Sequence, residues 1–399
     1  MQPANDRDLP LPGRLSPALL LYPLGHLAVE LYSSALSVMW PLLASRFALA
    51  YGAVGLLNMI FRSATTLPQL GFAHVSDRHG SRLPAVAGLL VVALGMSLIG
   101  LAPGVLALAI ILALAALGSA AFHPAATAYM SRTLPRRHAT AVAILMFGGN
   151  VGASLGPLIA ARLMGGRGLV ASTALLPLGL LIAPLILIFI PADSGAARRA
   201  QRASGPKAAI PPAMYLLMVA CAGQSWVDGS LSSYLSLLYT ARGLSLGAAS
   251  STLFVIAAAG AAGVFVGGAL SDRIPRWRVV VLAEALTVPL YIGTVLLGRS
   301  WALLVPAGLG FVSALSYPVT VTMGQEMMPN RTSLASAMTM GVSWVIGSLG
   351  VALNGVLADH IGMQASLLLN AAVPLTGMAA MFTLHYLQKR RARIAAQWG

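Results

Sequence analysis

The feature that most constrains this chain is a succession of long apolar runs joined by short polar connections. Each run is long enough to cross a bilayer, which takes about 20 residues in a helix. The twelve runs lie near residues 16–43, 51–73, 83–102, 104–130, 138–164, 168–190, 213–240, 247–270, 278–298, 301–327, 332–357 and 364–387. Lipid cannot hydrogen-bond the backbone, so each run is expected to be a helix. The sequence therefore predicts an all-α membrane protein with twelve transmembrane helices.

The composition agrees with this class and excludes a soluble globular domain. Hydrophobic residues make up 58% of the 399 residues and charged residues 9%, whereas soluble chains carry about a quarter charged residues. The formal net charge of +15 would favour nucleic-acid binding in a soluble protein. Here most of the Lys and Arg fall between the runs or at their ends, as in loops that face anionic cytoplasmic lipid. The basic residues therefore imply the lipid bilayer as a partner, and we expect no binding to nucleic acid.

The basic residues also predict the orientation of the chain. An even number of spans places both termini on one side, and the cytoplasmic side is the one that receives more Lys and Arg. With cytoplasmic termini, the basic clusters around residues 78–82, 132–137, 198–207 and 273–278 all face the cytoplasm. The first run is too long for a signal-peptide core and is expected to be a retained helix. We predict that both termini are cytoplasmic.

One long polar connection, residues 191–212, divides the chain into two groups of six spans. It is rich in Pro, Ala, Gly and Arg and is expected to be a flexible cytoplasmic linker. Residues 1–190 and 213–399 would then form two six-helix bundles. Residues recur between the halves at an offset of 194, with Pro124, Pro135 and Gly156 matching Pro318, Pro329 and Gly350. Such a parallel repeat indicates halves related by an axis along the membrane normal.

A charged turn between the second and third runs recurs in the second half. The residues concerned are Gly71, Asp77, Arg78, Gly80 and Arg82, then Gly267, Gly268, Asp272, Arg273, Arg276 and Arg278. Pro275 replaces the glycine of the first copy, and Trp277 replaces its last arginine. Both copies resemble the signature loop of the major facilitator superfamily. The resemblance implies two bundles that alternate in access, with Asp77 and Asp272 making gate contacts to arginines or to a helix N-terminus of the other half.

Small residues dominate one face of the fifth span. They belong to the segment Gly148, Gly149, Asn150, Gly152, Gly156 and Pro157. The glycines leave a smooth face for close helix contact, and the proline permits a bend. The segment resembles the motif of drug/proton antiporters, although Ala160 and Ala161 replace the closing glycines. Ordinary helix packing is an equal alternative.

Further motifs in both halves narrow the resemblance. They are Gly25-His26-x-x-x-Glu30, Ala121-Phe122-His123-Pro124, Tyr317-Pro318, Gln325-Glu326-Met-Met-Pro329 and Gly355-Val-Leu-Ala-Asp359-His360. Together they resemble the fosmidomycin-resistance group of efflux proteins. The resemblance implies a monomeric, proton-driven exporter of small toxic compounds in a bacterial-type inner (plasma) membrane. Leu114 stands where drug antiporters have an arginine, so other residues must couple protons.

Ionisable side chains at membrane depth are the candidate functional residues, because each costs about 2.5–3.5 kcal/mol unless paired or hydrated. They are His26, Glu30, Arg62, His123 and Asp228. The family architecture places all but Arg62 on spans that line a central cavity. Glu30 and Arg62 are expected at one depth on adjacent helices, as a buried pair with a structural or a transport role. The histidines either have a packing role or carry protons. Asp228 has no evident cationic partner in the sequence, which favours a functional role for it over a structural one.

Two other acidic residues are interpreted as structural. Glu284 and Glu326 lie nearer the cytoplasmic ends of their spans, where basic loops can neutralise them. The single cysteine, Cys221, excludes an intrachain disulfide and a cysteine metal cluster. Motifs of hydrolases, metalloproteases and P-loop proteins are missing from the sequence. We therefore predict no enzyme, no cofactor and no metal site.

These features predict a secondary active transporter. Its function would be proton-coupled efflux of a small drug-like or anionic compound by alternating access, with Glu30 or Asp228 loading protons. Arg62 would give the cavity a positive charge suited to an anion such as a phosphonate. The alternatives are a proton symporter that imports a small metabolite and a nontransporting membrane sensor.

Overall fold

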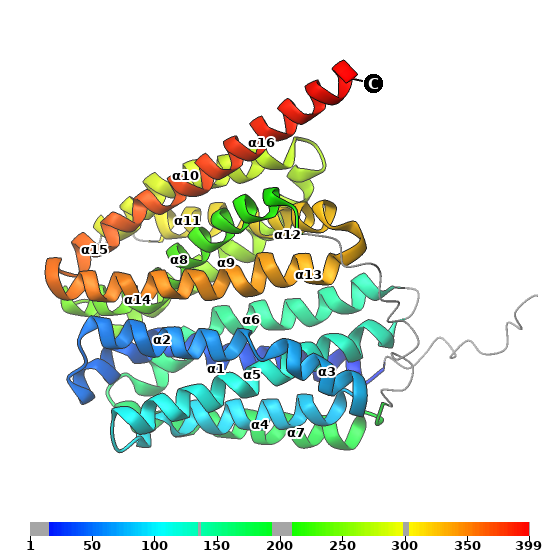
Figure 1. The fold of residues 1–399 in the computed structure, drawn as a ribbon. Helices are drawn as coiled ribbons and strands as arrows, with labels where there is room; N and C mark the ends of the chain where they lie inside the picture. The colour runs from blue at the N-terminus through cyan, green and yellow to red at the C-terminus, as the bar shows by residue number, and fades with distance from the viewer. Residues whose placement is uncertain (1–15, 135–136, 194–209, 298–302, 399) are drawn as a thin grey trace, which may run out of the picture.

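The chain folds into long, roughly parallel helices whose described first and last segments lie at one end of the bundle (Figure 1). The structure is a computed structural model that describes residues 16–134, 137–193, 210–297 and 303–398. Over these residues it contains helices and no strand. The last helix finishes at one end of the bundle, which we refer to as the terminal end. The other end is referred to as the opposite end. Most of the predicted linker and several loop arginines, Arg7, Arg14, Arg136, Arg198, Arg199, Arg202 and Arg299 among them, lie outside the described residues.

Each half contributes six spans, some built from two shorter helices. The first half comprises α1 (Ala18–Phe47), α2 (Tyr51–Thr66), α3 (Gln69–His79), α4 (Arg82–Leu98), α5 (Val105–Thr133), α6 (His138–Met164) and α7 (Leu176–Phe189). The second half comprises α8 (Pro212–Ala241), α9 (Leu246–Ser271), α10 (Arg276–Leu296), α11 (Leu304–Ala314), α12 (Ser316–Met327), α13 (Thr332–Ser336), α14 (Ser343–Ile361), α15 (Met363–Leu369) and α16 (Val373–Trp398). Pairs such as α11 and α12, or α15 and α16, follow each other with little or no gap and act as one span.

The predicted twelve-helix membrane fold is confirmed. Ten helical segments of the described chain are long and apolar enough to cross a membrane. The second span is divided between α2 and α3 because Pro68, which has no N–H to donate, stands between them. The seventh span, α8, is 30 residues long but carries buried polar residues, such as Gln224, Ser230 and Ser233. These side chains lower its hydropathy because they face the protein interior instead of lipid.

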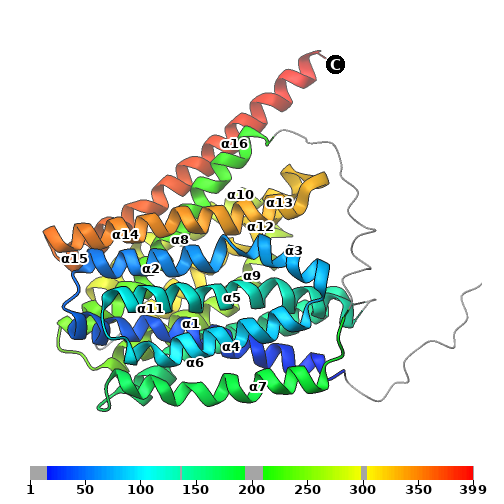
Figure 2. The same ribbon diagram turned by 60° about the horizontal axis from the view of Figure 1, so that its bottom comes forward.

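The two halves repeat the same packing and meet mainly along two helix pairs. In the first half α1 packs along α6, and in the second half α8 packs along α14. Between the halves, α2 lies against α14 and α6 against α9. Figures 1 and 2 both show α2 and α14 side by side. A bundle built this way can separate at either end by rocking one half against the other.

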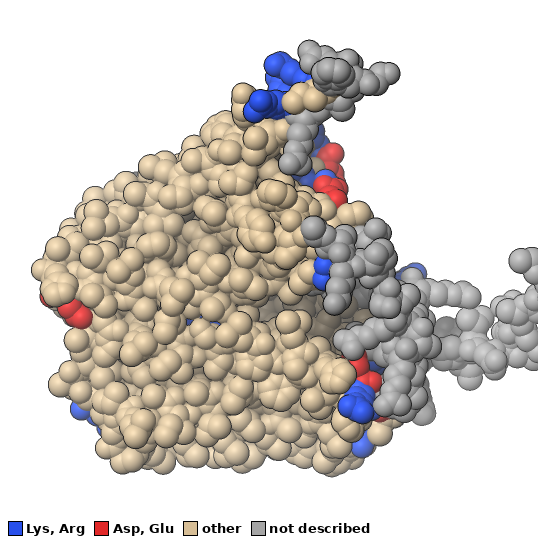
Figure 3. Space-filling view, viewed as in Figure 1, with Lys and Arg blue, Asp and Glu red and all other residues tan. Residues whose placement is uncertain are grey.

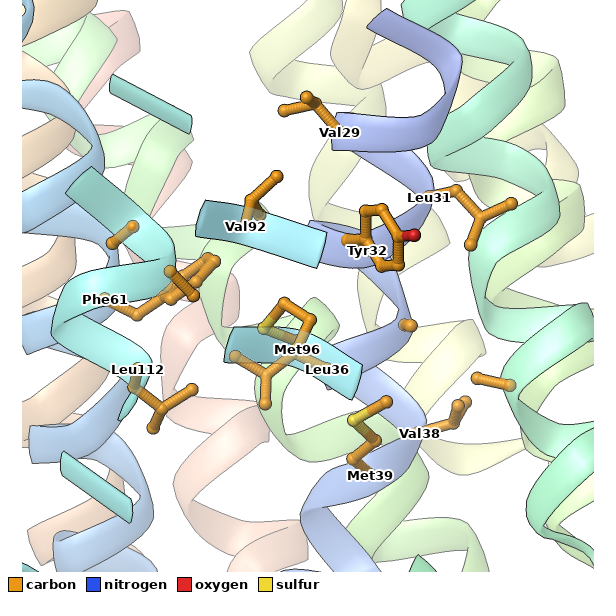
Figure 4. Packing of buried hydrophobic residues seen from close by; sticks show 14 of the residues in the cluster. Val29, Leu31, Tyr32, Leu36, Val38, Met39, Phe61, Val92, Met96 and Leu112 are labelled. Carbon is orange, nitrogen blue, oxygen red and sulfur yellow. The ribbon is translucent and has the colours of Figure 1, made fainter. Parts of the chain in front are cut away.

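Apolar side chains occupy both the interior and the outer surface. Inside the first half, Tyr32 and Met39 of α1 are fully buried near Met96 of α4 (Figure 4). Outside, large apolar residues such as Leu106 and Phe265 are more than 70% exposed. The face in Figure 3 has a broad band without charge, and its charged residues gather mainly at the terminal end. This distribution is the one a bilayer requires.

The glycines of the fifth span bring α6 into direct contact with α1. A Cβ atom at Gly152 would lie 2.1 Å from the carbonyl oxygen of Leu27. A Cβ atom at Gly149 would lie 2.4 Å from the imidazole ring of His26. Within this motif Asn150 is exposed, and Pro157 lies inside α6 without ending it. The glycine face therefore sets the position of α1 and of the candidate residue His26.

A methyl group at Gly152 should destabilise the protein, whereas one at Gly268 should not. Alanine favours a helix over glycine by about 0.5–1 kcal/mol, but at Gly152 it must displace backbone, and such overpacking costs about 1–3 kcal/mol. Gly268 on α9 has no atom within 4 Å of the added position and is the matched control. We expect Gly152→Ala to lower the melting temperature and Gly268→Ala to keep or raise it. Equal melting temperatures would show that the α1–α6 contact is not tight.

Candidate functional site

Three ionisable side chains of the first half form one cluster between α1 and α5. His123 Nε2 lies 2.8 Å from Glu30 Oε1, and His26 Nε2 lies 3.7 Å from the same oxygen. The side chains of Glu30 and His123 remain 28% and 22% exposed, whereas that of His26 is 6% exposed. The cluster therefore has a buried side at His26 and an accessible side at the other two residues.

The outer nitrogens of both histidines are held by backbone carbonyls. His26 Nδ1 is 2.8 Å from the Leu145 carbonyl oxygen, and His123 Nδ1 is 2.7 Å from that of Ser119. A carbonyl oxygen only accepts hydrogen bonds, so each Nδ1 carries a hydrogen and a neutral ring presents a lone pair at Nε2. Two such lone pairs face a carboxylate, which is also an acceptor. The 2.8 Å contact therefore requires a proton between Glu30 and His123.

The same three side chains also have the composition of a metal site, but their spacing favours a proton. Their candidate ligand atoms all lie within 4.8 Å of one another. Two ligands of one tetrahedral ion, each about 2.1 Å from it, lie about 3.4 Å apart. The His123–Glu30 separation of 2.8 Å is shorter and is the length of a charge-assisted hydrogen bond. The described cluster is thus arranged to hold a proton.

A second polar cluster joins the two halves around Asp228. The Tyr317 hydroxyl donates to Asp228 Oδ2 at 2.5 Å. The guanidinium of Arg62, on α2, donates to the Ser225 hydroxyl at 3.1 Å and interacts electrostatically with both Asp228 and Tyr317. Asp228 thus has a cation nearby, contrary to the expectation from sequence. Its partner comes from the other half of the protein.

The expected pair between Glu30 and Arg62 is wrong. Glu30 is hydrogen-bonded to His123 of its own half, whereas Arg62 points toward α8 of the other half. The reason is that α2 packs mainly against α14 and makes little contact with α1. Equal depth in the membrane therefore did not bring the two charges together. The five candidate residues form two separate clusters.

A cavity of about 390 Å³ lies beside the second cluster, among α8, α9, α12 and α14. Its walls are apolar and aromatic with several hydroxyl groups. The residues with polar or aromatic side chains are Cys221, Gln224, Tyr317, Thr320, Thr322, Thr339 and Trp344. The rings of Tyr317 and Trp344 stand edge to face, with centroids 6.5 Å apart. The volume and lining suit a small amphipathic molecule.

Sequence reasoning missed Tyr317 as a functional residue, although the repeat contained the signal. The separation of Tyr317 from His123 is 317 − 123 = 194, the offset between the halves. Both residues precede a proline, and both hydrogen-bond to an acidic side chain. The repeat pairs Tyr317 with His123 and Gln224 with Glu30, so it marks Tyr317 as the counterpart of a candidate residue, and Asp228 lies one helical turn beyond the counterpart of Glu30. Trp344 and Ser225 carry no comparable signal in the sequence.

The charged turn of the first half is tied to a residue that the sequence did not single out. The Asp193 carboxylate accepts hydrogen bonds from the backbone N–H groups of Ser81 at 2.8 Å and Arg82 at 3.1 Å, at the start of α4. Arg132 forms an ion pair with the same carboxylate. Gly80 has a φ of 92°, and a Cβ there would lie 2.1 Å from the Asp193 carbonyl oxygen. Asp193 therefore locks the turn within its own half.

The second copy of the turn also contains an ion pair. Arg276 pairs with Glu326, as the neutralisation of Glu326 by a basic loop predicted. The acidic partner comes from α12 here, whereas in the first half Arg132 of α5 pairs with Asp193. The other motif residues Gly71, Arg78, Asp272 and Arg273 are exposed. The gate role assigned to Asp77 and Asp272 stays a prediction.

At the opposite end, hydrogen bonds join the two halves. The Asp359 carboxylate of α14 accepts from the backbone N–H groups of Tyr51 and Gly52, each at 2.8 Å. These are the first N–H groups of α2, where a helix dipole favours a negative charge. Nearby, the Ser236 hydroxyl donates to the Ser37 carbonyl oxygen. The halves are therefore held closed at this end.

Two bundles of six spans, a repeat between them and a cavity within the second bundle, beside the residues that join the halves, are the features of a membrane transporter. The sequence matches the profile of the Major Facilitator Superfamily over residues 24–351. The chain belongs to this family.

The chain is similar to curated bacterial proteins over most of its length. It is 28% identical over 370 residues to the fosmidomycin resistance protein of Escherichia coli (strain K12), covering 90% of each chain. It is 25% identical over 402 residues to the uncharacterized MFS-type transporter YfnC of Bacillus subtilis (strain 168), covering 98% of each. The resemblance to the fosmidomycin-resistance group is confirmed.

Solved transporter structures share the fold. A bacterial homologue of the human lysosomal transporter Spinster, in an inward-facing and occupied conformation, matches with a TM-score of 0.81 and 17% identity, over 94% of this chain and 98% of that one. The D-xylose–proton symporter matches with a TM-score of 0.75 and 14% identity, over 92% and 96%. At these identities the comparison establishes the arrangement of the helices alone.

Removing the charge of Asp359 should loosen the closed end. Asparagine retains one acceptor oxygen but loses the charge that interacts with the start of α2. We expect Asp359→Asn to increase thiol labelling at a cysteine introduced at Ser37 in a Cys221→Ser background. The bond from Ser236 reaches the backbone of Ser37, so this reporter leaves it in place. Asp359→Glu, which keeps the charge, is the control. Unchanged labelling in Asp359→Asn would show that this contact does not hold the end closed.

Proposed function

We propose that the protein is a proton-coupled exporter of a small drug-like or anionic compound, working by alternating access. The observation that carries this proposal is the Glu30–His123 hydrogen bond, which requires a proton in a partly accessible position. A transporter that binds and releases this proton on alternate sides would link substrate movement to the proton gradient. The similarity to the fosmidomycin resistance protein supports export as the direction.

In this proposal the two clusters have different tasks. His123 and Glu30 exchange the proton, while His26 fixes the buried side of the carboxylate. Arg62 and Asp228 adjoin Tyr317, which lines the cavity of the second half, and there the guanidinium would offer a positive charge to an anionic group. An anion at Arg62 would compete with Asp228 for the same cation. The Tyr317–Trp344 pair supplies an aromatic surface for the rest of the molecule.

We further propose the orientation and assembly that the sequence predicted. Both termini would lie in the cytoplasm of a bacterial inner membrane, with the chain working as a monomer. The opposite end, closed by Asp359, would then face outward. The charged turns would act at the cytoplasmic end, with Asp77 and Asp272 in the gate contacts.

Replacing Glu30 by glutamine should separate substrate binding from proton coupling. The amide has nearly the shape of the carboxyl group and can donate to His123 Nε2, so folding is preserved, but it cannot exchange a proton. In proteoliposomes, we expect Glu30→Gln to reduce transport driven by a pH gradient at least tenfold and to retain exchange of substrate between equal concentrations. Glu326→Gln, the same change in an ion-paired carboxylate that is 53% exposed, is the matched control. Full pH-driven transport in Glu30→Gln would remove this cluster from the mechanism.

A resistance assay tests the substrate and the direction. Cells that express the protein should survive higher concentrations of fosmidomycin or of another compound in an antibiotic panel. Asp228→Asn, which removes the charge opposite Arg62, should abolish that protection at equal expression. Greater sensitivity of expressing cells would indicate import and favour the symporter alternative. Binding without movement of any compound would favour the nontransporting sensor.

A further inference from the structure

Glu284 carries a buried carboxyl group that has no role in the proposed transport mechanism. It lies on α10 and is 4% exposed. Its expected neutralisation by basic loops is wrong, because none of the described Lys, Arg or His side chains lies within ion-pair distance of it. The described residues also give its carboxyl group no hydrogen bond. Glu284 thus differs from Glu326, which its neighbour Arg276 neutralises.

The carboxyl group of Glu284 faces a small polar cavity that it shares with Asp228. The cavity measures about 10 Å³, which is about the space one water molecule needs. It is lined by Gln224, Val227, Asp228, Ala283, Glu284, Thr287, Ser313 and Ser316. A water there has the two carboxyl groups and neighbouring hydroxyls as partners, within the two to four hydrogen bonds that a buried water makes.

Gln224 separates this small cavity from the larger one and is fixed in place. Its side-chain nitrogen donates to the Ser313 carbonyl oxygen at 2.5 Å, and its oxygen accepts from the Ser316 hydroxyl at 2.8 Å. Gln224 lines both cavities, and Tyr317, the partner of Asp228, lines only the larger. Asp228 therefore has the substrate cavity on its Tyr317 side and the small cavity on its Glu284 side.

The charges around the small cavity decide which carboxyl group holds a proton. Glu284 interacts electrostatically with Asp228, a group of the same sign, and with the thiol of Cys221 on α8. Asp228 in turn faces Arg62, Tyr317 and Tyr291. Arg62 and the Tyr317 hydroxyl stabilise a charged Asp228, whereas nothing described stabilises a charged Glu284. An unpaired charge in such an interior is strongly unfavourable, so the proton belongs on Glu284.

We propose that Glu284, one buried water and Asp228 form a second proton site, behind the substrate cavity. The Glu284 carboxyl group donates its proton to the water while the water donates one to the Asp228 carboxylate. One O–H bond breaks and one forms at each step, and the pair keeps a single negative charge throughout. A proton can reach Asp228 by this route while substrate occupies the cavity on the Tyr317 side. The inference rests on the proposed role of Asp228, but not on the direction of transport.

Infrared spectroscopy tests the proton on Glu284 without any substrate. The full chain in lipid nanodiscs at neutral pH should show the carbonyl stretching band of a buried carboxylic acid. Glu284→Gln should remove this band, and the exposed matched variant Glu326→Gln should keep it. Asp228→Asn should shift the band, because the water loses its charged acceptor. An identical band in wild type and Glu284→Gln would overturn the assignment, whether or not the protein transports protons.

Stability and transport measurements add independent readouts. Glu284→Leu replaces an unpaired carboxyl group by an apolar side chain of similar size, so we expect a higher melting temperature. In proteoliposomes, Glu284→Gln should slow pH-driven transport at least tenfold and retain substrate exchange. A lower melting temperature in Glu284→Leu, or full pH-driven transport in Glu284→Gln, would contradict the proposal. Stimulation by sodium in wild type but not in Glu284→Gln would show that the cavity binds a sodium ion instead.

Discussion

A charge buried among apolar helices must be neutralised, and this constraint accounts for the polar architecture of the protein. Water is not available in the bilayer to stabilise isolated ions. Glu30 is therefore bonded to His123, and Asp228 to Tyr317, with Arg62 close by. Each of these contacts crosses between helices that differ in sequence position by many residues. The helices that carry them cannot move independently without exposing a charge, so motion and neutralisation are linked.

The closed end shows the same constraint in another form. Asp359 is neutralised by two backbone N–H groups at the start of α2, and no basic side chain is needed. A helix N-terminus has unpaired N–H donors whether or not the halves are together, because the first turn has no internal acceptor for them. Asp359 is exposed, so when the contact breaks its carboxylate and the N–H groups can both be solvated by water. At the other end Asp193 uses the start of α4 in the same way, but within one half. Similar chemistry thus fixes a turn in one place and joins the two halves in another.

The fold was predictable from the sequence because length, hydropathy and the repeat are properties of whole segments. Side-chain partners were less predictable, since they depend on how helices rotate and which neighbours they choose. Glu30 and His26 were placed together because they lie one helical turn apart, and the structure adds His123 to them. Arg62 was assigned to the wrong partner because its helix packs against the other half. Glu284 was judged by its distance along the sequence from basic loops, which says nothing about the direction in which its side chain points.

The repeat also shows how a duplicated bundle can divide the work of coupled transport. Glu30 and His123 of the first half correspond, at the offset of 194, to Gln224 and Tyr317 of the second. The first pair contains a histidine, a residue type that ordinarily gains or loses a proton near neutral pH, whereas an amide and a phenol do not. In their place the second half has Asp228, one helical turn beyond Gln224, next to a cavity of substrate size. In the proposed mechanism, the same scaffold positions therefore hold a proton in one half and line the substrate cavity in the other. In the proposed mechanism, Arg62 connects them, because it belongs to the proton-binding half but its guanidinium reaches the substrate-binding half. Any rotation of the halves that moves Arg62 away from α8 would leave Asp228 without its cation and so increase its demand for a proton.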